Sequence, residues 1–318
     1  MSVRGGKSAK RSDDKNARRG GTRTRREPAP IRGAVLGADV SHSRSPVIHE
    51  AAFRALGIQG NYLARSVSAR GFRQVVAALA ADGYRYVNVT IPHKGLAAAL
   101  ATTRSAAVRA SGAANTLIFQ ARRATGARAK HKAGVRIRAE NTDGPGLLAA
   151  LGDLGGAPAD GIAVIVGSGG AAAGAVEALT AVGARVRIVA RRKRAALAMR
   201  ARLPAPRQPR ISVADWSPAN LAAALADADI LISAVPAAAW EASEARAGLE
   251  ALRPSAVVLE MAYGAGTPLA RAVEGRARRY ADGLGMLVHQ AAVAITLALG
   301  QEPPLAAMFA AVGVRSDE

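Results

Sequence analysis

Residues 161–167, with the sequence GIAVIVG, constrain the fold of this chain more than any other segment. An unbroken apolar run of this length is typical of a parallel strand that has helices on both faces. The run ends in the glycine-rich turn of residues 167–170, and residues 171–183 continue with the alanine-rich composition of a helix. A buried strand that passes into a helix through such a turn predicts one unit of a doubly wound, parallel α/β sheet.

The alternation of strand and helix continues from this unit to about residue 263. It predicts a Rossmann-type, doubly wound domain over residues 144–284, which begins with a helix over residues 145–155. Further strands are expected at residues 184–190, 210–215, 229–235 and 256–263, and further helices at residues 193–203, 217–228 and 241–252. The chain has 318 residues, so it has room for another domain before this one.

Residues 31–143 predict that other α/β domain, again with a parallel sheet. Its strands are expected at residues 31–37, 62–67, 84–91 and 113–119, and its helices near residues 45–57, 71–83 and 95–103. Ser45 is expected to cap the first of these helices, with Pro46 as the first helical residue. A last helix is expected near residues 285–300, and we expect residues 285–312 to pack back onto the first domain.

Positive charge is concentrated in two segments of a chain whose net charge is +21. Residues 1–32 carry eleven Lys and Arg against three acidic residues, and residues 122–138 carry seven Lys and Arg and no acidic residue. Residues 1–30 lack apolar periodicity and aromatic side chains, so we expect a disordered basic tail. Such a tail can bind nucleic-acid phosphates, but without aromatic side chains that stack on bases a specific nucleic-acid partner is not expected. Residues 122–138 are expected to form a loop or an extended hairpin.

Cysteine is absent, which excludes disulfides, thiolate metal sites and a cysteine nucleophile. The five histidines lack the spacing of a metal site, so no metal is expected. No apolar run has membrane-spanning length, and the N-terminal segment carries charge where a signal peptide has an apolar stretch. The sequence therefore predicts a cytoplasmic protein with no membrane partner.

The glycine-rich turn predicts a site for a dinucleotide. Its glycines permit a tight turn and let backbone N–H groups reach a pyrophosphate at the start of the helix. The residues expected at this site are Gly167, Ser168, Gly169, Gly170 and Ala171. A purely structural turn is the alternative interpretation.

The strand after this turn predicts which dinucleotide binds. It ends at Ala190, where NAD-binding proteins usually carry an acidic residue that holds the ribose hydroxyls. Here the basic residues Arg191, Arg192, Lys193 and Arg194 follow, so no acid repels a 2′-phosphate, and guanidinium groups bind phosphate in a bidentate manner. Basic residues at a helix start are unfavourable against the helix dipole, which itself indicates a bound anion. We therefore predict NADP in preference to NAD, bound by Arg191, Arg192 and Arg194.

Four polar motifs interrupt the apolar pattern of the first domain. They are residues 41–46, 88–94, 115–116 and 141–144. Most of them follow a predicted strand directly, where open α/β sheets bind ligands. Their hydroxyls, carboxamides, single cation and single carboxylate suit a small polyhydroxylated acid. Each motif taken alone is also compatible with a helix cap or a turn.

Taken together and in their order along the chain, the motifs resemble those of the shikimate dehydrogenase family, over about residues 33–312. The motifs are SHSRSPVIH, NVTIPHK, GAANT, NTDG, GSGGAAAG, EMAYGAGTP and GLGMLVHQAA. The resemblance implies an NADP-dependent oxidoreductase that reduces 3-dehydroshikimate to shikimate in the chorismate and aromatic amino-acid pathway. It places the active site in the cleft between the two domains.

The resemblance also implies roles for the matching side chains. Lys94 would be the acid/base catalyst, paired with Asp143. The residues expected to bind substrate are Ser43, Ser45, Thr90, Lys94, Asn115, Asp143, Tyr263 and Gln290. Met261 and Gly283 would line the nicotinamide side of the cofactor site.

The chain departs from the family pattern at three places on the cofactor side. Ala106 stands where the family often has a carboxylate. Residues 233–236 (Ser-Ala-Val-Pro) replace the usual Asn-Ala-Thr, and residues 190–192 (Ala-Arg-Arg) replace Asn-Arg-Thr.

Other functions remain open from the sequence. A quinate/shikimate or aminoshikimate dehydrogenase has the same fold, although two serines in the HSRSP motif favour shikimate by family analogy. A paralogue that binds its ligand without turnover, or a nucleic-acid-associated protein that uses the basic segments, would belong to a different class. The expected partner is a small-molecule substrate, and the expected assembly is a monomer or homodimer.

Overall fold

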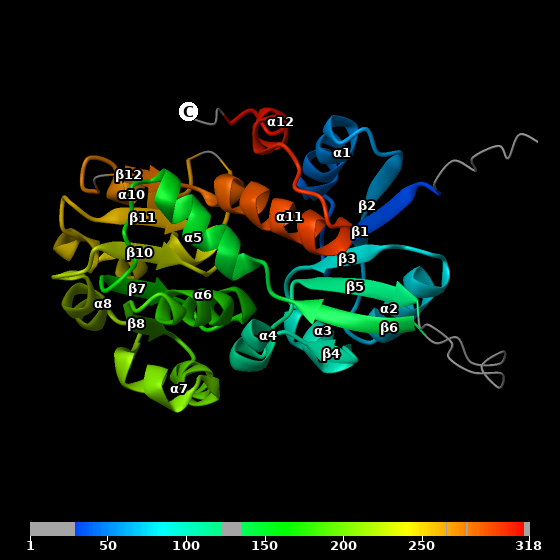
Figure 1. The fold of residues 1–318 in the computed structure, drawn as a ribbon. Coiled ribbons are helices and arrows are strands. Elements are labelled where there is room, and N and C mark those ends of the chain that lie inside the picture. The colour runs from blue at the N-terminus through cyan, green and yellow to red at the C-terminus, as the bar shows by residue number, and fades with distance from the viewer. Residues whose placement is uncertain (1–28, 122–134, 265, 278, 315–318) are drawn as a thin grey trace, which may run out of the picture.

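Two six-stranded sheets, each covered by helices on both faces, make up the computed structural model of this chain (Figure 1). The structure describes residues 29–121, 135–264, 266–277 and 279–314. Residues 1–28 of the expected basic tail and residues 122–134 of the basic segment lie outside the described residues.

The C-terminal sheet confirms the Rossmann-type, doubly wound topology. Its strands are β7 (Ile162–Val166), β8 (Arg185–Ala190), β9 (Ile211–Asp215), β10 (Ile230–Ser233), β11 (Val257–Glu260) and β12 (Arg279–Ala281). They lie in the order β12-β11-β10-β7-β8-β9, and every neighbouring pair is parallel. The winding reverses between β7 and β10, so the carboxyl ends of these two strands open the crevice in which such sheets bind ligands.

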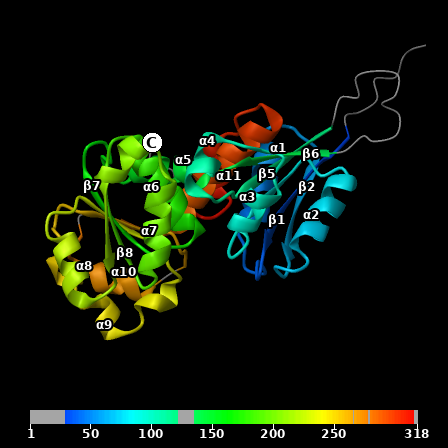
Figure 2. The ribbon, with the colours of Figure 1, turned by 90° about the horizontal axis from the view of Figure 1, so that it is seen from below.

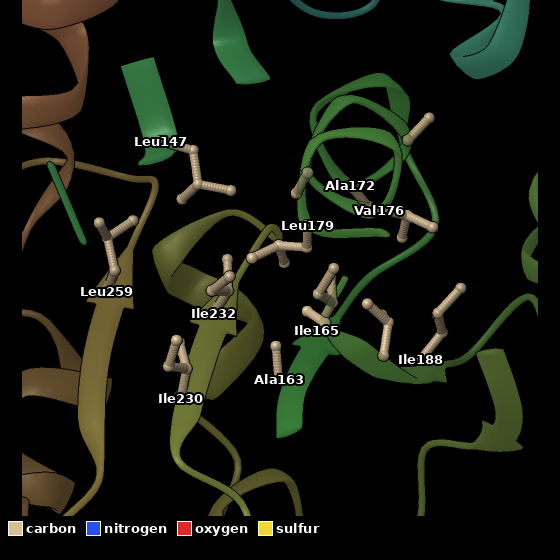
Figure 3. Packing of buried hydrophobic residues seen from close by; sticks show 14 of the residues in the cluster. Leu147, Ala163, Ile165, Ala172, Val176, Leu179, Ile188, Ile230, Ile232 and Leu259 are labelled. Carbon is tan, nitrogen blue, oxygen red and sulfur yellow. The ribbon is translucent and has the colours of Figure 1, made fainter. Parts of the chain in front are cut away.

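Apolar side chains cover this sheet on both sides, which explains the unbroken apolar run of β7. The helices on one face are α5 (Asp143–Asp153), α6 (Gly170–Ala181) and α7 (Lys193–Arg202), and those on the other are α8 (Pro218–Leu225) and α10 (Pro268–Val273). Figure 3 shows Leu147 of α5 and Leu179 of α6 above Ile165 and Ile232 of the strands. All five residues of β7 are buried, so their burial anchors the glycine-rich turn that follows.

The N-terminal sheet is mixed, and the prediction of a parallel sheet is wrong here. Its strands are β1 (Ile31–Gly37), β2 (Gly60–Ser66), β3 (Tyr86–Val89), β4 (Thr103–Arg104), β5 (Thr116–Ala121) and β6 (Val135–Glu140), in the order β2-β1-β3-β5-β6-β4. β1 is parallel to β2 and β3, but β5 is antiparallel to β3 and to β6. Ala121 at the end of β5 pairs with Val135 at the start of β6, which is the register of a hairpin.

Helices cover both faces of this sheet as well. On one face lie α1 (Ser45–Ala55), α11 (Gly283–Leu299) and α12 (Leu305–Ala310), and on the other lie α2 (Phe72–Ala81), α3 (Lys94–Leu100) and α4 (Ala106–Ser111). α11 takes part in both cores, because Met286 packs against the C-terminal sheet while Val288 and Ile295 pack against the N-terminal one. Figure 2 shows α11 and α4 between the two sheets.

Some short elements differ from the expected ones. The helix expected at residues 241–252 is replaced by the short pieces η3 (Ala237–Trp240), α9 (Ser243–Arg246) and η4 (Leu249–Ala251). Gly248, within this segment, lies so close to α8 that an added Cβ would be 2.6 Å from the Pro218 carbonyl oxygen. The sequence also missed α4, α10 and β12, whose short lengths leave little periodicity to detect.

α5 and α11 cross at close range. A Cβ atom added to Gly146 of α5 would lie 2.7 Å from the Cβ and 2.8 Å from the backbone nitrogen of Gln290. Further along the same contact, His289 Nε2 lies 2.6 Å from Asp153 Oδ2. The small glycine therefore allows the helices to approach and brings Gln290 beside the start of α5.

None of the described helices is both long enough and apolar enough to cross a lipid bilayer.

The contact at Gly146 generates a stability prediction with an internal control. Gly146→Ala must push α11 away and is expected to lower the free energy of unfolding by about 1–3 kcal/mol, as overpacked core substitutions do. Gly152→Ala, in the same helix, meets nothing within 4 Å and is expected to raise it by about 0.5–1 kcal/mol through helix propensity. Urea unfolding of both variants measures the difference, and equal effects would contradict the close crossing.

Candidate active site

A cavity of about 390 Å³ opens between the two sheets, at the carboxyl ends of β1, β3 and β10. The structure places many of the sequence-predicted site residues in its wall. They are Ser43, Ser45, Thr90, Lys94, Asn115, Asp143, Ala171, Met261, Tyr263, Gly283 and Gln290. Segments from both halves of the chain therefore meet at one cavity.

Lys94 and Asp143 form a buried ion pair in this wall. Lys94 Nζ lies 2.6 Å from Asp143 Oδ2, and the two side chains are 10% and 8% exposed. Lys94 is the first residue of α3 and Asp143 the first of α5. The dipole of α5 favours the carboxylate, but that of α3 disfavours an ammonium group, so Asp143 is the group that stabilises the charge of Lys94. Removing either partner would leave a buried charge without compensation.

Asn115 links this pair to the C-terminal helix α11. Its Nδ2 donates to Asp143 Oδ1 at 2.8 Å and to Gln290 Oε1 at 3.1 Å. Its Oδ1 accepts from the backbone N–H of Thr142 at 2.7 Å. Asp143 thus has one carboxylate oxygen on Lys94 and the other on Asn115, and its orientation is set from both sides.

The serines of the first polar motif lie at the start of α1, but Ser45 is not the expected cap. The helix starts at Ser45 itself, with Arg44 as the capping residue and no side-chain cap bond in the described structure. Pro46 is accordingly the second helical residue. Ser45 is buried, its N–H donates to Ser43 Oγ at 3.3 Å, and both serines face the cavity. The hydroxyl of Ser45 is therefore available to a ligand rather than used by the helix.

Asp39, His42 and Asn88 also line the cavity, although the sequence singled out none of them as site residues. Asp39 Oδ1 accepts from the backbone N–H of Ser41 at 3.0 Å and from its hydroxyl at 2.7 Å. These two hydrogen bonds lower the pKa of Asp39, so its carboxylate is charged at neutral pH. Their positions in the sequence were the available signal. Asp39 lies two residues before Ser41, His42 is the first residue of the HSRSP motif, and Asn88 is the first residue of the NVTIPHK motif.

The glycine-rich turn has the backbone geometry that a pyrophosphate site needs. Gly167 has a φ of +129°, and a Cβ there would lie 2.9 Å from the Ala234 carbonyl oxygen. Gly169 caps α6, a Cβ there would meet nothing within 4 Å, and no side-chain cap is described. Without a side-chain cap, the first N–H groups of α6 are available to a phosphate-bearing cofactor. A Cβ at Gly170 would lie 3.1 Å from the Cβ of Lys94, so this turn lies beside the ion pair.

The basic cluster of Arg191, Arg192 and Arg194 is exposed at the start of α7, outside the cavity wall. The guanidinium carbon of Arg191 lies 5.8 Å from the ring centre of Trp216. Lys193 Nζ lies 2.9 Å from Asp215 Oδ2, so one of the four cations is paired. The exposed arginines fit a 2′-phosphate at the carboxyl end of β8.

The residues that depart from the family pattern have structural roles in this chain. Ser233 is fully buried, and its Oγ accepts from Trp240 Nε1 at 2.9 Å. Val235 and Pro236 line the cavity, and Ala106 starts α4. His93, which is next to Lys94 in the sequence, has its Nε2 2.7 Å from the Val67 carbonyl oxygen. Within the described part of the chain, no three His, Asp or Glu side chains are arranged to hold a metal ion.

Two family models match this chain. The model of the shikimate dehydrogenase substrate binding domain matches residues 35–117, and the model of the alanine dehydrogenase/PNT C-terminal domain matches residues 138–288. The curated shikimate dehydrogenase (NADP(+)) of Acidovorax sp. (strain JS42) is 38% identical over 278 residues, which cover 86% of this chain and 92% of that protein. This chain belongs to the shikimate dehydrogenase family.

Solved structures of shikimate dehydrogenases share the fold. The Mycobacterium tuberculosis shikimate dehydrogenase matches with a TM-score of 0.73 and 33% identity, over 89% of this chain and 99% of that one. The Thermus thermophilus shikimate 5-dehydrogenase, solved in complex with NADP(H) and shikimate, matches with a TM-score of 0.70 and 27% identity, over 88% and 98% of the two chains. The family and the two-part α/β fold expected from the sequence are thereby confirmed.

The free hydroxyl of Ser45 leads to a prediction for this member of the shikimate dehydrogenase family. Ser45→Ala is expected to change the free energy of unfolding by less than about 0.5 kcal/mol, because no cap bond is lost. Ser217→Ala is the matched control, since Ser217 also precedes a proline but accepts from Asn220 N–H at 3.3 Å as the cap of α8. The control is expected to lose about 1 kcal/mol in urea unfolding. An equal loss in both variants would show that Ser45 supports the helix.

Proposed function

We propose that this protein catalyses the reversible, NADPH-dependent reduction of 3-dehydroshikimate to shikimate. The buried Lys94–Asp143 pair at a cavity lined by hydroxyls and carboxamides carries this proposal. The volume of this cavity, about 390 Å³, falls in the range of small-ligand pockets. Curated relatives at 34–38% identity bear the name shikimate dehydrogenase (NADP(+)).

Lys94 acts as the acid in this proposal. NADPH, when bound, supplies the hydride that reduces the ring ketone. The ammonium group of Lys94 donates a proton to the oxygen of that ketone and stabilises the negative charge that develops on it. Asp143 accepts from Lys94 Nζ and so fixes the direction of the ammonium group. In the reverse direction, neutral Lys94 takes the proton from the substrate hydroxyl.

The remaining cavity residues bind and orient the substrate. We assign the substrate carboxylate to the hydroxyls of Ser43 and Ser45, because both lie at the same end of α1. The ring hydroxyls are assigned to Asn115, Asp143 and Gln290, which already form one hydrogen-bonded group. Thr90 and Tyr263 complete the substrate contacts in this proposal.

Residues at the carboxyl edge of the C-terminal sheet would hold the cofactor. We assign the pyrophosphate to residues 167–171 at the start of α6, and the 2′-phosphate to Arg191, Arg192 and Arg194. Met261 and Gly283 are assigned to the nicotinamide side. A Cβ at Gly283 would lie only 2.2 Å from the Met261 carbonyl oxygen, so a glycine is required for this approach.

We also propose which parts of the chain bind the substrate and which part binds the cofactor. Residues 31–143 bind the substrate, together with residues 285–312, whose helices pack against the N-terminal sheet. Residues 144–284 bind NADP. The family models at residues 35–117 and 138–288 support this division. The cytoplasmic location, the monomeric or dimeric state and the disordered tail of residues 1–30 stay predictions.

Steady-state assays test the proposed function. The protein is assayed with shikimate and with quinate, each with NADP and with NAD, and the highest kcat/KM is expected for shikimate with NADP. Lys94→Ala is expected to lower kcat by about 10²–10⁴-fold, as loss of a general acid does. Absence of turnover with every pair would overturn the enzyme assignment, and wild-type turnover by Lys94→Ala would overturn the role of this lysine alone.

The arginine cluster leads to a separate prediction for cofactor choice. Arg191→Ser is expected to raise KM for NADP by about tenfold or more, because a charge-assisted hydrogen bond to phosphate is lost. KM for NAD is expected to stay unchanged. Arg185→Ser is the control, since Arg185 is exposed at the opposite end of β8. A parallel rise of both KM values would place Arg191 away from the 2′-phosphate.

A further inference from the structure

We propose that Tyr62 and Thr116 are positioning residues that set the orientation of the Asn115 carboxamide. They do so through a directed chain of hydrogen bonds that runs from Tyr62 through Asn88 and Thr116 to Asn115. The chain starts behind the cavity wall and ends on Asp143. Its consequence for turnover rests on the proposed function, but its geometry does not.

A carboxamide can be turned by 180°, which exchanges its oxygen and nitrogen. For Asn115, one orientation directs Nδ2 at the carboxylate of Asp143, and the other would direct an oxygen at it and repel it. Asn115 Oδ1 accepts from Thr142 N–H at 2.7 Å and from Thr116 Oγ1 at 3.1 Å. These donors hold the oxygen away from Asp143.

The hydroxyl of Thr116 has one proton to give. Thr116 Oγ1 accepts from Asn88 Nδ2 at 2.9 Å and so does not donate to Asn88. Of its other two partners, Asn115 Oδ1 at 3.1 Å is nearer than Thr142 Oγ1 at 3.4 Å, so its own proton is directed to Asn115 Oδ1. If Asn88 presented its oxygen instead, Thr116 would donate to Asn88, and Asn115 would lose this donor. The orientation of Asn88 is therefore transmitted to Asn115.

Tyr62 decides the orientation of Asn88. Its hydroxyl lies 2.6 Å from Asn88 Oδ1, and Asn88 is the hydrogen-bond partner described for it. Burial raises the pKa of Tyr62 well above its usual value, so the hydroxyl keeps its proton and must donate it. A turned Asn88 would leave that proton buried without this acceptor, which is costly.

The ring of His49 packs against the ring of Tyr62. The two rings are stacked with centres 3.9 Å apart and planes 2° apart. Burial lowers the pKa of His49 to about 3, so the ring is neutral at neutral pH. His49 therefore places no charge beside the Tyr62 end of the hydrogen-bond chain. His49 and Ser45 lie four residues apart on α1, so the helix that carries Ser45 also supports Tyr62.

Tyr86 supplies a matched control. Its ring is buried like that of Tyr62, and its hydroxyl lies 2.6 Å from His49 Nδ1, outside the chain that leads to Asn115. Tyr62→Phe and Tyr86→Phe each remove one buried hydroxyl from the same aromatic group and keep the ring. We expect similar losses in melting temperature from the two variants.

The two variants are expected to differ in kinetics. Tyr62→Phe should lower kcat/KM for shikimate about tenfold, with KM for NADP within about twofold of the wild type, while Tyr86→Phe changes neither. In an Asn115→Ala background, Tyr62→Phe should cause no further loss, because both changes act through one carboxamide. Equal kinetic losses in the two tyrosine variants, or an additive loss in the double variant, would overturn the proposal.

A spectroscopic measurement separates this inference from the proposed function. In ¹H–¹⁵N spectra the side-chain amide of Asn115, assigned by its absence in Asn115→Ala, should shift and exchange faster in Tyr62→Phe but not in Tyr86→Phe. An unchanged signal in Tyr62→Phe overturns the chain of hydrogen bonds whether or not the wild type oxidises shikimate. A shifted signal in a protein without turnover supports the chain and overturns the proposed function.

Thr116 gives a second route if Tyr62→Phe does not fold. Thr116→Ser keeps the hydroxyl and is expected to retain both the Asn115 signal and turnover. Thr116→Val keeps the shape but removes the hydroxyl, and is expected to shift the Asn115 signal and to lower kcat/KM to the same extent as Tyr62→Phe would. Equal behaviour of the serine and valine variants would overturn the role of the Thr116 hydroxyl.

Discussion

The buried pair of Lys94 and Asp143 is the interaction on which the rest of the site depends. A charged side chain that is buried away from water is tolerated when an oppositely charged partner and further hydrogen bonds compensate it. Asp143 meets that requirement with Lys94 on one oxygen and Asn115 on the other, at the start of a helix whose dipole favours a carboxylate. Such an arrangement leaves little freedom in the position of either charged group, which is what directed proton transfer requires.

Close backbone approaches hold the elements around this pair. Gly146 lets α11 pass α5 and brings in Gln290, Gly170 brings the glycine-rich turn beside Lys94, and Gly283 brings the start of α11 against Met261. At each of these glycines an added Cβ would lie 2.2–3.1 Å from its nearest neighbour. Functional side chains from the two halves of the chain thus line one cavity, because glycines stand where the elements that carry them come into contact.

Much of the fold was predictable because its elements are long and periodic. The buried strand of residues 161–167 and its alternating successors specified the doubly wound sheet, and its observed strand order agrees. The mixed N-terminal sheet was not predictable, since the direction of β5 depends on its pairing with β3 and β6 and not on its own composition. The close contact of Gly248 with Pro218 of α8 was likewise not predictable, because the two residues are distant in sequence.

The sequence by itself determined which chemical groups this protein has: the ion-pair residues, the serines, the carboxamides, the glycine-rich turn and the arginines at residues 191–194. Residue type and position indicated the turn and the arginines, whereas the roles of the other groups followed from the resemblance of their motifs to those of the family. The tertiary structure alone decided how the groups are oriented. That Ser45 faces the cavity and caps nothing, and that Tyr62 reaches Asn115 through Asn88 and Thr116, depends on contacts between residues far apart in sequence. Hydrogen bonds are directional, and their direction is set by geometry that the order of residues does not contain.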